Sequence, residues 1–200
     1  MLAFLSKSPL KCYNKSMPKL LLHICCAPCA TYISLERLKP RFDLTWYFYN
    51  PNLNSLEEYE KRLAAVKFVA AKYSIPLMVE PYEHAVWQAK ISGCENAPEC
   101  GERCRICYAQ RLEKTARLAD AQGFDFFATS LSLSPYKDKE TIRGLGRALG
   151  GAFKTQFLDE DFQANNGYTK SQALAKELGL YRQKFCGCEY SLSPSLKTAK

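Results

Sequence analysis

Short apolar and aromatic runs recur along the chain, and each is typical of a strand buried inside a parallel sheet. The segments between them are more polar and carry apolar residues at helical spacing. The expected strands are Leu20–Ile24, Leu44–Tyr49, Pro76–Val79, Asp125–Thr129 and Phe153–Leu158. The expected helices cover about Tyr32–Leu38, Ser55–Tyr73, Arg103–Gln122, Lys139–Leu149 and Lys170–Leu178. Because strand and helix alternate, the pattern predicts an α/β fold, with a parallel sheet and helices on both of its faces.

Local signals indicate where several of these elements begin and end. Thr31 is a suitable N-cap for the first helix, and Ser55 with Glu58 has the spacing of a capping box at the start of the second. Residues 81–102 keep no period and predict a long loop with one helical turn near Trp87. In such sheets, ligands bind at the carboxyl ends of the strands, so we look for chemistry there.

The composition indicates a single domain without a membrane-spanning segment. A chain of 200 residues with 47% hydrophobic and 24% charged residues fits a single globular domain, and no apolar run could cross a bilayer. Without a recognisable secretory signal, we expect a cytoplasmic protein. Most of the net charge of +8 comes from lysines near the two ends, so charge alone supports RNA binding only weakly. We expect a basic tail over 1–18 and a single domain over 19–200.

Ten cysteines are unusual for a cytoplasmic protein, where thiols stay reduced and disulfide frameworks are rare. They are therefore better explained as metal ligands or catalytic thiols. Seven of them form three clusters, which are Cys25, Cys26 and Cys29; Cys104 and Cys107; and Cys186 and Cys188. The first cluster follows the first expected strand, and the second lies on one face of a helix because its members are three apart. Four thiolates gathered at one sheet edge favour an iron–sulfur cluster or structural zinc.

Two other kinds of chemistry fit part of this pattern. Cys26 and Cys29 form a thioredoxin-like Cys-x-x-Cys, so a metal-free dithiol oxidoreductase is one alternative, although it leaves Cys104 and Cys107 unexplained. Nucleotide activation is the other, but no glycine occurs between Leu20 and Arg41 to form a phosphate-binding loop. The Cys186-Gly187-Cys188 segment can form a strained, easily reduced disulfide or offer thiols to a metal.

The order of the motifs resembles the epoxyqueuosine reductase family of the QueH type, over about residues 19–191. The matching motifs are His23-x-Cys25-Cys26-Ala27-Pro28-Cys29, Glu58-Tyr59-x-x-Arg62, Arg103-Cys104-x-x-Cys107-Tyr108-x-x-Arg111-Leu112, Thr129 to Lys137, Asp161-Phe162, Gly167-Tyr168 and Tyr181 to Ser191. The resemblance implies a Rossmann-like, HUP-type fold. It also implies two-electron reduction of epoxyqueuosine to queuosine at the wobble position of tRNA, without cobalamin.

The resemblance further implies a cofactor and roles for the clustered cysteines. It assigns a [4Fe-4S] cluster to Cys25, Cys26, Cys104 and Cys107. Cys186 and Cys188 are expected to be a redox-active pair that an external electron donor keeps reduced. A second, mononuclear metal, expected to be iron, has Cys29 and Asp161 as candidate ligands. The residues 19–200 are then an iron–sulfur catalytic domain, and tRNA carrying epoxyqueuosine is the expected partner.

The remaining candidates have structural explanations beside the functional ones. Arg62, Arg111 and Lys137 are candidate tRNA contacts, since arginine and lysine bind phosphate, although a helix-face position explains Arg62 nearly as well. Three aromatic residues can stack on a splayed base or simply pack around the cysteine turn, namely Tyr181, Phe185 and Tyr190. Three cysteines are expected to be free thiols, namely Cys12, Cys94 and Cys100. His23 ends a buried strand and is expected to be a hydrogen-bonded core residue.

A zinc-stabilised tRNA-binding or adaptor domain without redox activity is the competing function class. A closed zinc site of four thiolates needs no dithiol beside it. Cys186 and Cys188 are therefore the feature of the sequence that argues against this class.

Overall fold

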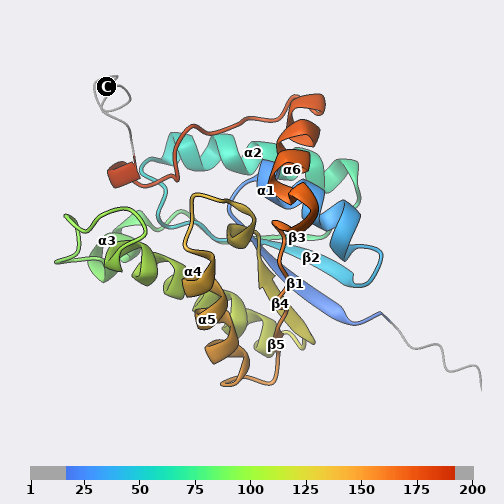
Figure 1. Ribbon diagram of the computed structural model, residues 1–200, viewed down its shortest axis with the longest axis horizontal. Helices are drawn as coiled ribbons and strands as arrows, with labels where there is room; N and C mark the ends of the chain where they lie inside the picture. The colour runs from blue at the N-terminus through green and yellow to red at the C-terminus, as the bar shows by residue number, and fades with distance from the viewer. Residues whose placement is uncertain (1–16, 192–200) are drawn as a thin grey trace, which may run out of the picture.

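A five-stranded sheet, parallel throughout, forms the centre of the computed structural model, which describes residues 17–191 (Figure 1). The strand order is β3-β2-β1-β4-β5. The strands are β1 (Lys19–Ile24), β2 (Asp43–Phe48), β3 (Leu77–Val79), β4 (Phe126–Thr129) and β5 (Gln156–Phe157). This is the Rossmann-like order, in which the chain changes direction across the sheet between β1 and β4 and leaves a crevice at their carboxyl ends. The predicted α/β class is confirmed.

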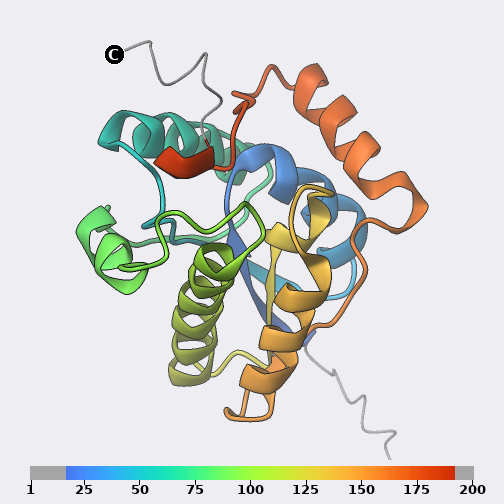
Figure 2. The ribbon, with the colours of Figure 1, turned by 60° about the vertical axis from the view of Figure 1, so that its left-hand side comes forward.

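Helices cover both faces of the sheet (Figures 1 and 2). On one face α1 (Ala27–Tyr32) packs against α6 (Gly167–Glu177) and α2 (Leu56–Lys72). On the other face α4 (Glu102–Ala121) packs against α5 (Lys139–Gly150). The remaining helical segments are η1 (Ile33–Leu38, a π-helix), α3 (His84–Lys90), η2 (Ser130–Leu133), η3 (Ala164–Asn166) and η4 (Glu189–Ser191).

Strand β1 lies in the middle of the sheet because its side chains are apolar on both faces. Leu20, Leu21, Leu22 and Ile24 are all fully buried. Burying a leucine or isoleucine side chain contributes roughly 1.5–3 kcal/mol, so this strand anchors the core. The strand also fixes the position of Cys25, which comes directly after Ile24 in the chain.

The first helix begins earlier than the sequence predicted. Its first residue is Ala27 rather than Tyr32, with Pro28 inside its first turn. Proline is favoured there because its fixed φ suits a helix start and its missing N–H would have no helical partner. The expected cap, Thr31, lies inside the helix and donates from Oγ1 to the carbonyl oxygen of Ala27 at 2.8 Å. The cysteine motif therefore forms the beginning of the helix rather than a loop before it.

Three other elements differ from expectation in their extent. Helix α3 replaces the single turn expected near Trp87, which is fully buried and fastens the helix to the core. Helix α6 begins at Gly167, three residues before the expected start. Strand β5 covers only two residues of the expected Phe153–Leu158. It is an edge strand with one neighbour, so fewer backbone hydrogen bonds extend it.

The capping box predicted at Ser55 forms only in half. Ser55 Oγ accepts a hydrogen bond from the backbone N–H of Glu58 at 3.2 Å, as predicted. The Glu58 carboxylate, however, binds Arg62 instead of returning to the cap. Because the Glu58 carboxylate binds Arg62, helix α2 contributes an ion pair to the candidate site.

No helix within residues 17–191 is long and apolar enough to cross a membrane. Residues 1–16 of the expected basic tail, with Cys12, lie outside the described residues. The expected division at residue 18 stays a prediction.

Candidate metal and redox site

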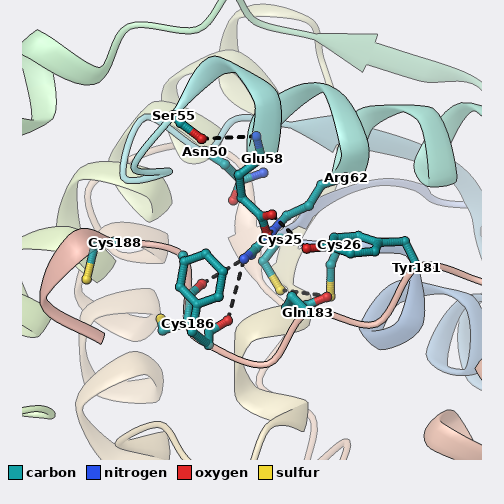
Figure 3. Close-up of polar contacts among 12 residues, drawn as sticks. Cys25, Cys26, Asn50, Ser55, Glu58, Arg62, Tyr181, Gln183, Cys186 and Cys188 are labelled. Carbon is teal, nitrogen blue, oxygen red and sulfur yellow. Dashed lines mark hydrogen bonds and ion pairs between the residues drawn. The ribbon is translucent and has the colours of Figure 1, made fainter. Parts of the chain in front are cut away.

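Three buried thiols meet where β1 passes into α1. The ligand atoms of Cys25, Cys26 and Cys29 all lie within 4.8 Å of one another, and we call this group the thiol triad. Cys26 is the N-cap of α1 and Cys29 lies in its first turn, so the early start of the helix brings the three together. The sulfur atoms of Cys25 and Cys26 are 3.8 Å apart (Figure 3). The predicted gathering of soft ligands after the first strand is confirmed.

The three thiols of the triad differ in acidity. Hydrogen bonds from the Cys26 and Cys29 thiols stabilise a thiolate at Cys25 and hold its pKa well below the usual value. The hydrogen bond with Cys25 raises the pKa of the Cys26 thiol to about 12. The hydrogen bond between Cys25 and Cys29 likewise raises the pKa of Cys29. Ser130, the first residue after β4, assists by donating to Cys25 Sγ at 3.5 Å. Cys25 is therefore the first of the three to ionise.

The donor set of the triad fits a soft metal. A metal–sulfur bond of about 2.3 Å in a tetrahedral site places its sulfur ligands about 4 Å apart, close to the spacing observed here. Thiolates select iron, zinc or copper over magnesium and calcium. The triad can thus hold iron or zinc with a fourth position free for another ligand.

The second and third cysteine clusters lie against one another. Cys107 and Cys188 share a small apolar cluster with Trp87 and Ile91, whereas Cys104 is half-buried at the start of α4. Burial raises the pKa of the Cys107 thiol to about 11, although Arg111 acts against it. All nine cysteines within residues 17–191 are free thiols. Cys104 and Cys107 are not members of the thiol triad, so their predicted role with Cys25 and Cys26 stays a prediction.

Lys137 and Arg111 each donate a hydrogen bond to a thiol outside the triad. Lys137 Nζ donates to Cys186 Sγ at 3.1 Å, and Arg111 Nη2 donates to Cys107 Sγ at 3.2 Å. Burial alone would raise the pKa of Cys186, but the charges of Lys137 and Arg111 outweigh burial and lower it. Among the residues from 17 to 191, no carboxylate forms an ion pair with Lys137. The Cys186 sulfur is thus the hydrogen-bond partner of this half-buried ammonium, and the lowered pKa of Cys186 favours its thiolate.

A buried network from α2 holds the segment that carries Cys186 (Figure 3). Arg62, only 2% exposed, donates from Nε to Glu58 Oε1 at 2.7 Å and from Nη1 to the carbonyl oxygen of Cys186 at 3.1 Å. Tyr181 donates to the second carboxylate oxygen of Glu58 at 2.7 Å. Arg62 therefore positions the cysteine segment, which is the structural explanation of this residue, and it is not free to bind phosphate with its Nε.

Gly187 is required between the two cysteines. Its φ of +133° lies in a region that other residues rarely adopt, and an added Cβ would come within 2.6 Å of Leu53 Cδ2. Its carbonyl oxygen accepts a hydrogen bond from the backbone N–H of Asn54 at 2.9 Å. The turn after β2 thus holds the Cys-Gly-Cys segment in place.

A cavity of about 380 Å³ opens between these groups. Cys25, Cys29 and Cys186 line it with Lys137, so two of the three cysteine clusters and a half-buried cation face one space. The residues around the remainder of the wall are mostly polar or aromatic, and include Tyr136, Tyr168, Gln172, Arg182, Gln183 and Lys184. We call this cavity the thiol pocket. It is the place where a substrate could meet the reactive thiols.

One predicted metal ligand lies elsewhere. Asp161 accepts from Lys139 Nζ at 3.2 Å and from the backbone N–H of Gln163, and it is not a member of the thiol triad. His23 is fully buried, as expected for a core residue. Cys94 is half-buried and Cys100 exposed, which agrees with their interpretation as free thiols.

Two residues that contact the triad received no role in the sequence analysis. Ser130 contacts Cys25, and Gln183 donates from Nε2 to Cys26 Sγ at 3.0 Å. The role of Ser130 could have been inferred, because it directly follows β4 at the crevice of a Rossmann-like sheet. Gln183 lies in a motif of the family resemblance, but in an irregular segment where no local pattern indicates a contact with Cys26.

The comparison with known proteins identifies the family. A solved structure of similar fold, the U34-tRNA thiolase NcsA from Methanococcus maripaludis with its [4Fe-4S] cluster, has a TM-score of 0.55 and 15% identity. The match covers 90% of this chain and only 63% of that one, and shows the fold alone. A family model described as epoxyqueuosine reductase QueH matches residues 20–194.

Curated relatives agree with the family model. A protein from Streptococcus pyogenes named epoxyqueuosine reductase QueH is 37% identical, over 87% of this chain and 70% of that protein. One of the same name from Thermotoga maritima is 36% identical, over 88% of this chain and 91% of that protein. The resemblance in the sequence is thereby confirmed, and the chain belongs to the QueH family of epoxyqueuosine reductases, which are oxidoreductases.

Proposed function

We propose that the protein reduces epoxyqueuosine to queuosine at the wobble position of tRNA. The thiol pocket carries this proposal, because thiols of two clusters and the half-buried Lys137 ammonium line one space within a chain of this family. Reduction removes the epoxide oxygen as water and leaves a carbon–carbon double bond. The reaction consumes two electrons and two protons, so the site must supply both.

A [4Fe-4S] cluster is proposed at Cys25, Cys26, Cys104 and Cys107. Such a cluster supplies electrons one at a time when bound. The thiolate donors suit iron, and the thiolase of similar fold carries the same kind of cluster. A second, mononuclear iron is part of the proposal as well. Cys29 is a suitable ligand for it because it belongs to the thiol triad, whereas Asp161 offers no support in its present contacts.

Cys186 and Cys188 are proposed as the redox-active pair. When the two thiols join in a disulfide they release two electrons and two protons, which equals the demand of the epoxide. The lowered pKa of Cys186 favours its thiolate, the reactive form in such chemistry. Lys137, beside Cys186, is placed to hold a proton near the oxygen that leaves. An external electron donor must then reduce the disulfide, which agrees with the expected cytoplasmic location.

The decisive experiment incubates reduced, iron-loaded protein with tRNA carrying epoxyqueuosine under anaerobic conditions, followed by nucleoside analysis. We expect queuosine to appear in the presence of a reductant. Cys186→Ser should keep the cluster absorbance and lose turnover, whereas Cys104→Ser should lose iron. Cys94→Ser is the matched control, because Cys94 lies outside the three clusters and should change neither quantity.

Metal analysis separates this function from a zinc-stabilised adaptor domain. Family membership favours the reductase. A colourless protein that contains only zinc and leaves epoxyqueuosine unchanged would contradict the proposal, and full turnover by Cys186→Ser would remove the redox pair from it.

A further inference from the structure

Tyr136 stands at the mouth of the thiol pocket with most of its ring in solvent. It is 71% exposed, the highest value among the exposed large hydrophobic residues in the described part of the chain. Two of the three thiols that line the same pocket are deeply placed, since Cys25 and Cys29 are each 6% exposed. The pocket thus has the exposed ring of Tyr136 at its opening and the buried thiols of Cys25 and Cys29 at its floor.

The backbone beneath Tyr136 is fixed by hydrogen bonds. Its N–H donates to Ser134 Oγ at 3.3 Å, and its carbonyl oxygen accepts from Cys100 Sγ at 3.5 Å. The ring meets Tyr168 edge-on, with ring centroids 6.0 Å apart and planes at 86°. Tyr136 is therefore an exposed ring on an ordered turn, braced from one side and with its other side open.

The charge around the pocket suits a polyanion. Arg62 and Lys137 are already engaged by the Glu58 carboxylate and Cys186 Sγ, but the lining also includes the cations Arg182 and Lys184, against a single carboxylate, Glu99. Single-stranded RNA is typically bound by such a combination, in which cations contact the backbone and an aromatic ring stacks on a base. A protein partner would be expected to need a broader apolar surface than one ring.

The aromatic residues suggested by the sequence are already engaged. Tyr181 donates its hydroxyl to Glu58, and Arg62 stacks over the ring of Phe185 at 5.6 Å. Arg103 covers the ring of Tyr190 at 4.6 Å. These contacts favour packing roles for all three residues and leave Tyr136 as the free ring at the pocket.

We propose that Tyr136 is a stacking platform for the wobble base of tRNA, with Tyr168 bracing its ring. This inference rests on the proposed function. The modified side group must reach the thiols on the floor, so the base that carries it lies at the mouth, beside Tyr136. Tyr136 is thus a substrate-binding residue that selects a base splayed out of the anticodon loop.

The test measures binding of an anticodon stem–loop RNA that carries epoxyqueuosine, by fluorescence anisotropy over a series of salt concentrations. Tyr136→Ala should weaken binding roughly 5- to 150-fold, the range for loss of one stacked base. Tyr136→Phe should bind as the parent does, because the ring is kept. The slope of log Kd against log salt should stay the same, since no phosphate contact is lost. Phe68→Ala removes a comparably exposed ring outside the pocket and should have no effect.

Each outcome has a distinct meaning. Equal binding by Tyr136→Ala and the parent would overturn the platform, as would a reduced salt slope, which marks a lost phosphate contact. If Tyr136→Ala binds RNA as the parent does but is reduced more slowly by the electron donor, Tyr136 contacts the donor protein. That result would also overturn the platform. A parent protein that binds the RNA but leaves epoxyqueuosine intact would refute the proposed function, while the binding data would still decide the role of Tyr136.

Discussion

Cys186 and Lys137 show how two partly buried groups influence one another's charge. A lysine removed from water without a carboxylate beside it is costly unless another anion accompanies it. Cys186 Sγ accepts a hydrogen bond from Lys137 Nζ at 3.1 Å. Burial lowers the pKa of Lys137, but Cys186 and Cys25 outweigh burial and raise it, so the contact favours an ammonium beside a thiolate. The reactivity of Cys186 therefore depends on a residue far away in sequence.

Removal of this charge should make Cys186 less acidic. In Lys137→Met the thiolate loses the cation that donates to it, so the pKa of Cys186 should rise. The measurement is the pH dependence of alkylation of the Cys186 peptide by iodoacetamide, read by mass spectrometry. Lys139→Met is the control, because Lys139 pairs with Asp161 instead. An unchanged alkylation profile in Lys137→Met would show that the ammonium does not set the acidity of Cys186.

At the scale of elements, hydrogen bonds of the His23 ring link the carboxyl ends of strands β1, β2 and β4. It lies at the end of β1, and its Nδ1 is 2.9 Å from Oγ1 of Thr129, the last residue of β4. Its Nε2 is 3.0 Å from the carbonyl oxygen of Tyr49, just after β2. A carbonyl can only accept, so Nε2 carries the hydrogen and Nδ1 accepts from Thr129. The neutral ring thus aligns the edge of the sheet from which the thiol triad emerges.

This arrangement makes stability depend on pH. Burial, aided by Arg111, lowers the pKa of His23 from 6.5 to about 4. The unfolded chain therefore takes up a proton before the folded protein does, and stability falls as the pH drops below 6.5 towards 4. We expect a loss of roughly 2 kcal/mol between pH 7 and pH 5 from this group.

The variant His23→Gln isolates this contribution, because glutamine does not titrate. Urea unfolding at several pH values should show a weaker loss of stability in the variant than in the parent over the same window. Equal pH dependence of the two proteins would mean that other groups cause the loss.

The order of the elements was predictable from sequence, whereas the start of α1 and the long-range contacts between elements were not. The run from Leu20 to Ile24 is apolar without interruption except at His23, which identifies a buried strand regardless of its neighbours. The start of α1 was misplaced because Thr31 gave a capping signal that Pro28 overrides. The ion pair of Glu58 and Arg62 has helical spacing, but its link to the Cys186 carbonyl joins residues distant in sequence, and no local pattern encodes that contact.

For the molecule as a whole, the same ion pair joins the end of the described chain to helix α2. The segment after α6 has few regular backbone hydrogen bonds, and side chains hold it instead. Arg62 bonds to the carbonyl oxygens of Phe185 and Cys186, while Glu58 accepts from Tyr181. The placement of Cys186 over the thiol pocket thus depends on a helix from the first half of the chain.

Loss of Arg62 should destabilise the protein and release this segment. Arg62→Met leaves the Glu58 carboxylate buried without its partner, which typically costs about 3–5 kcal/mol. The double variant Glu58→Gln with Arg62→Met should recover part of that loss, since no unpaired charge remains. Hydrogen exchange at residues 185–188 should accelerate in the single variant. The exposed pair of Glu57 and Lys61 has the same spacing on the same helix, so Lys61→Met is the control and should unfold as the parent does. If exchange at 185–188 stays slow in Arg62→Met, contacts such as the Gly187 turn hold the segment without α2.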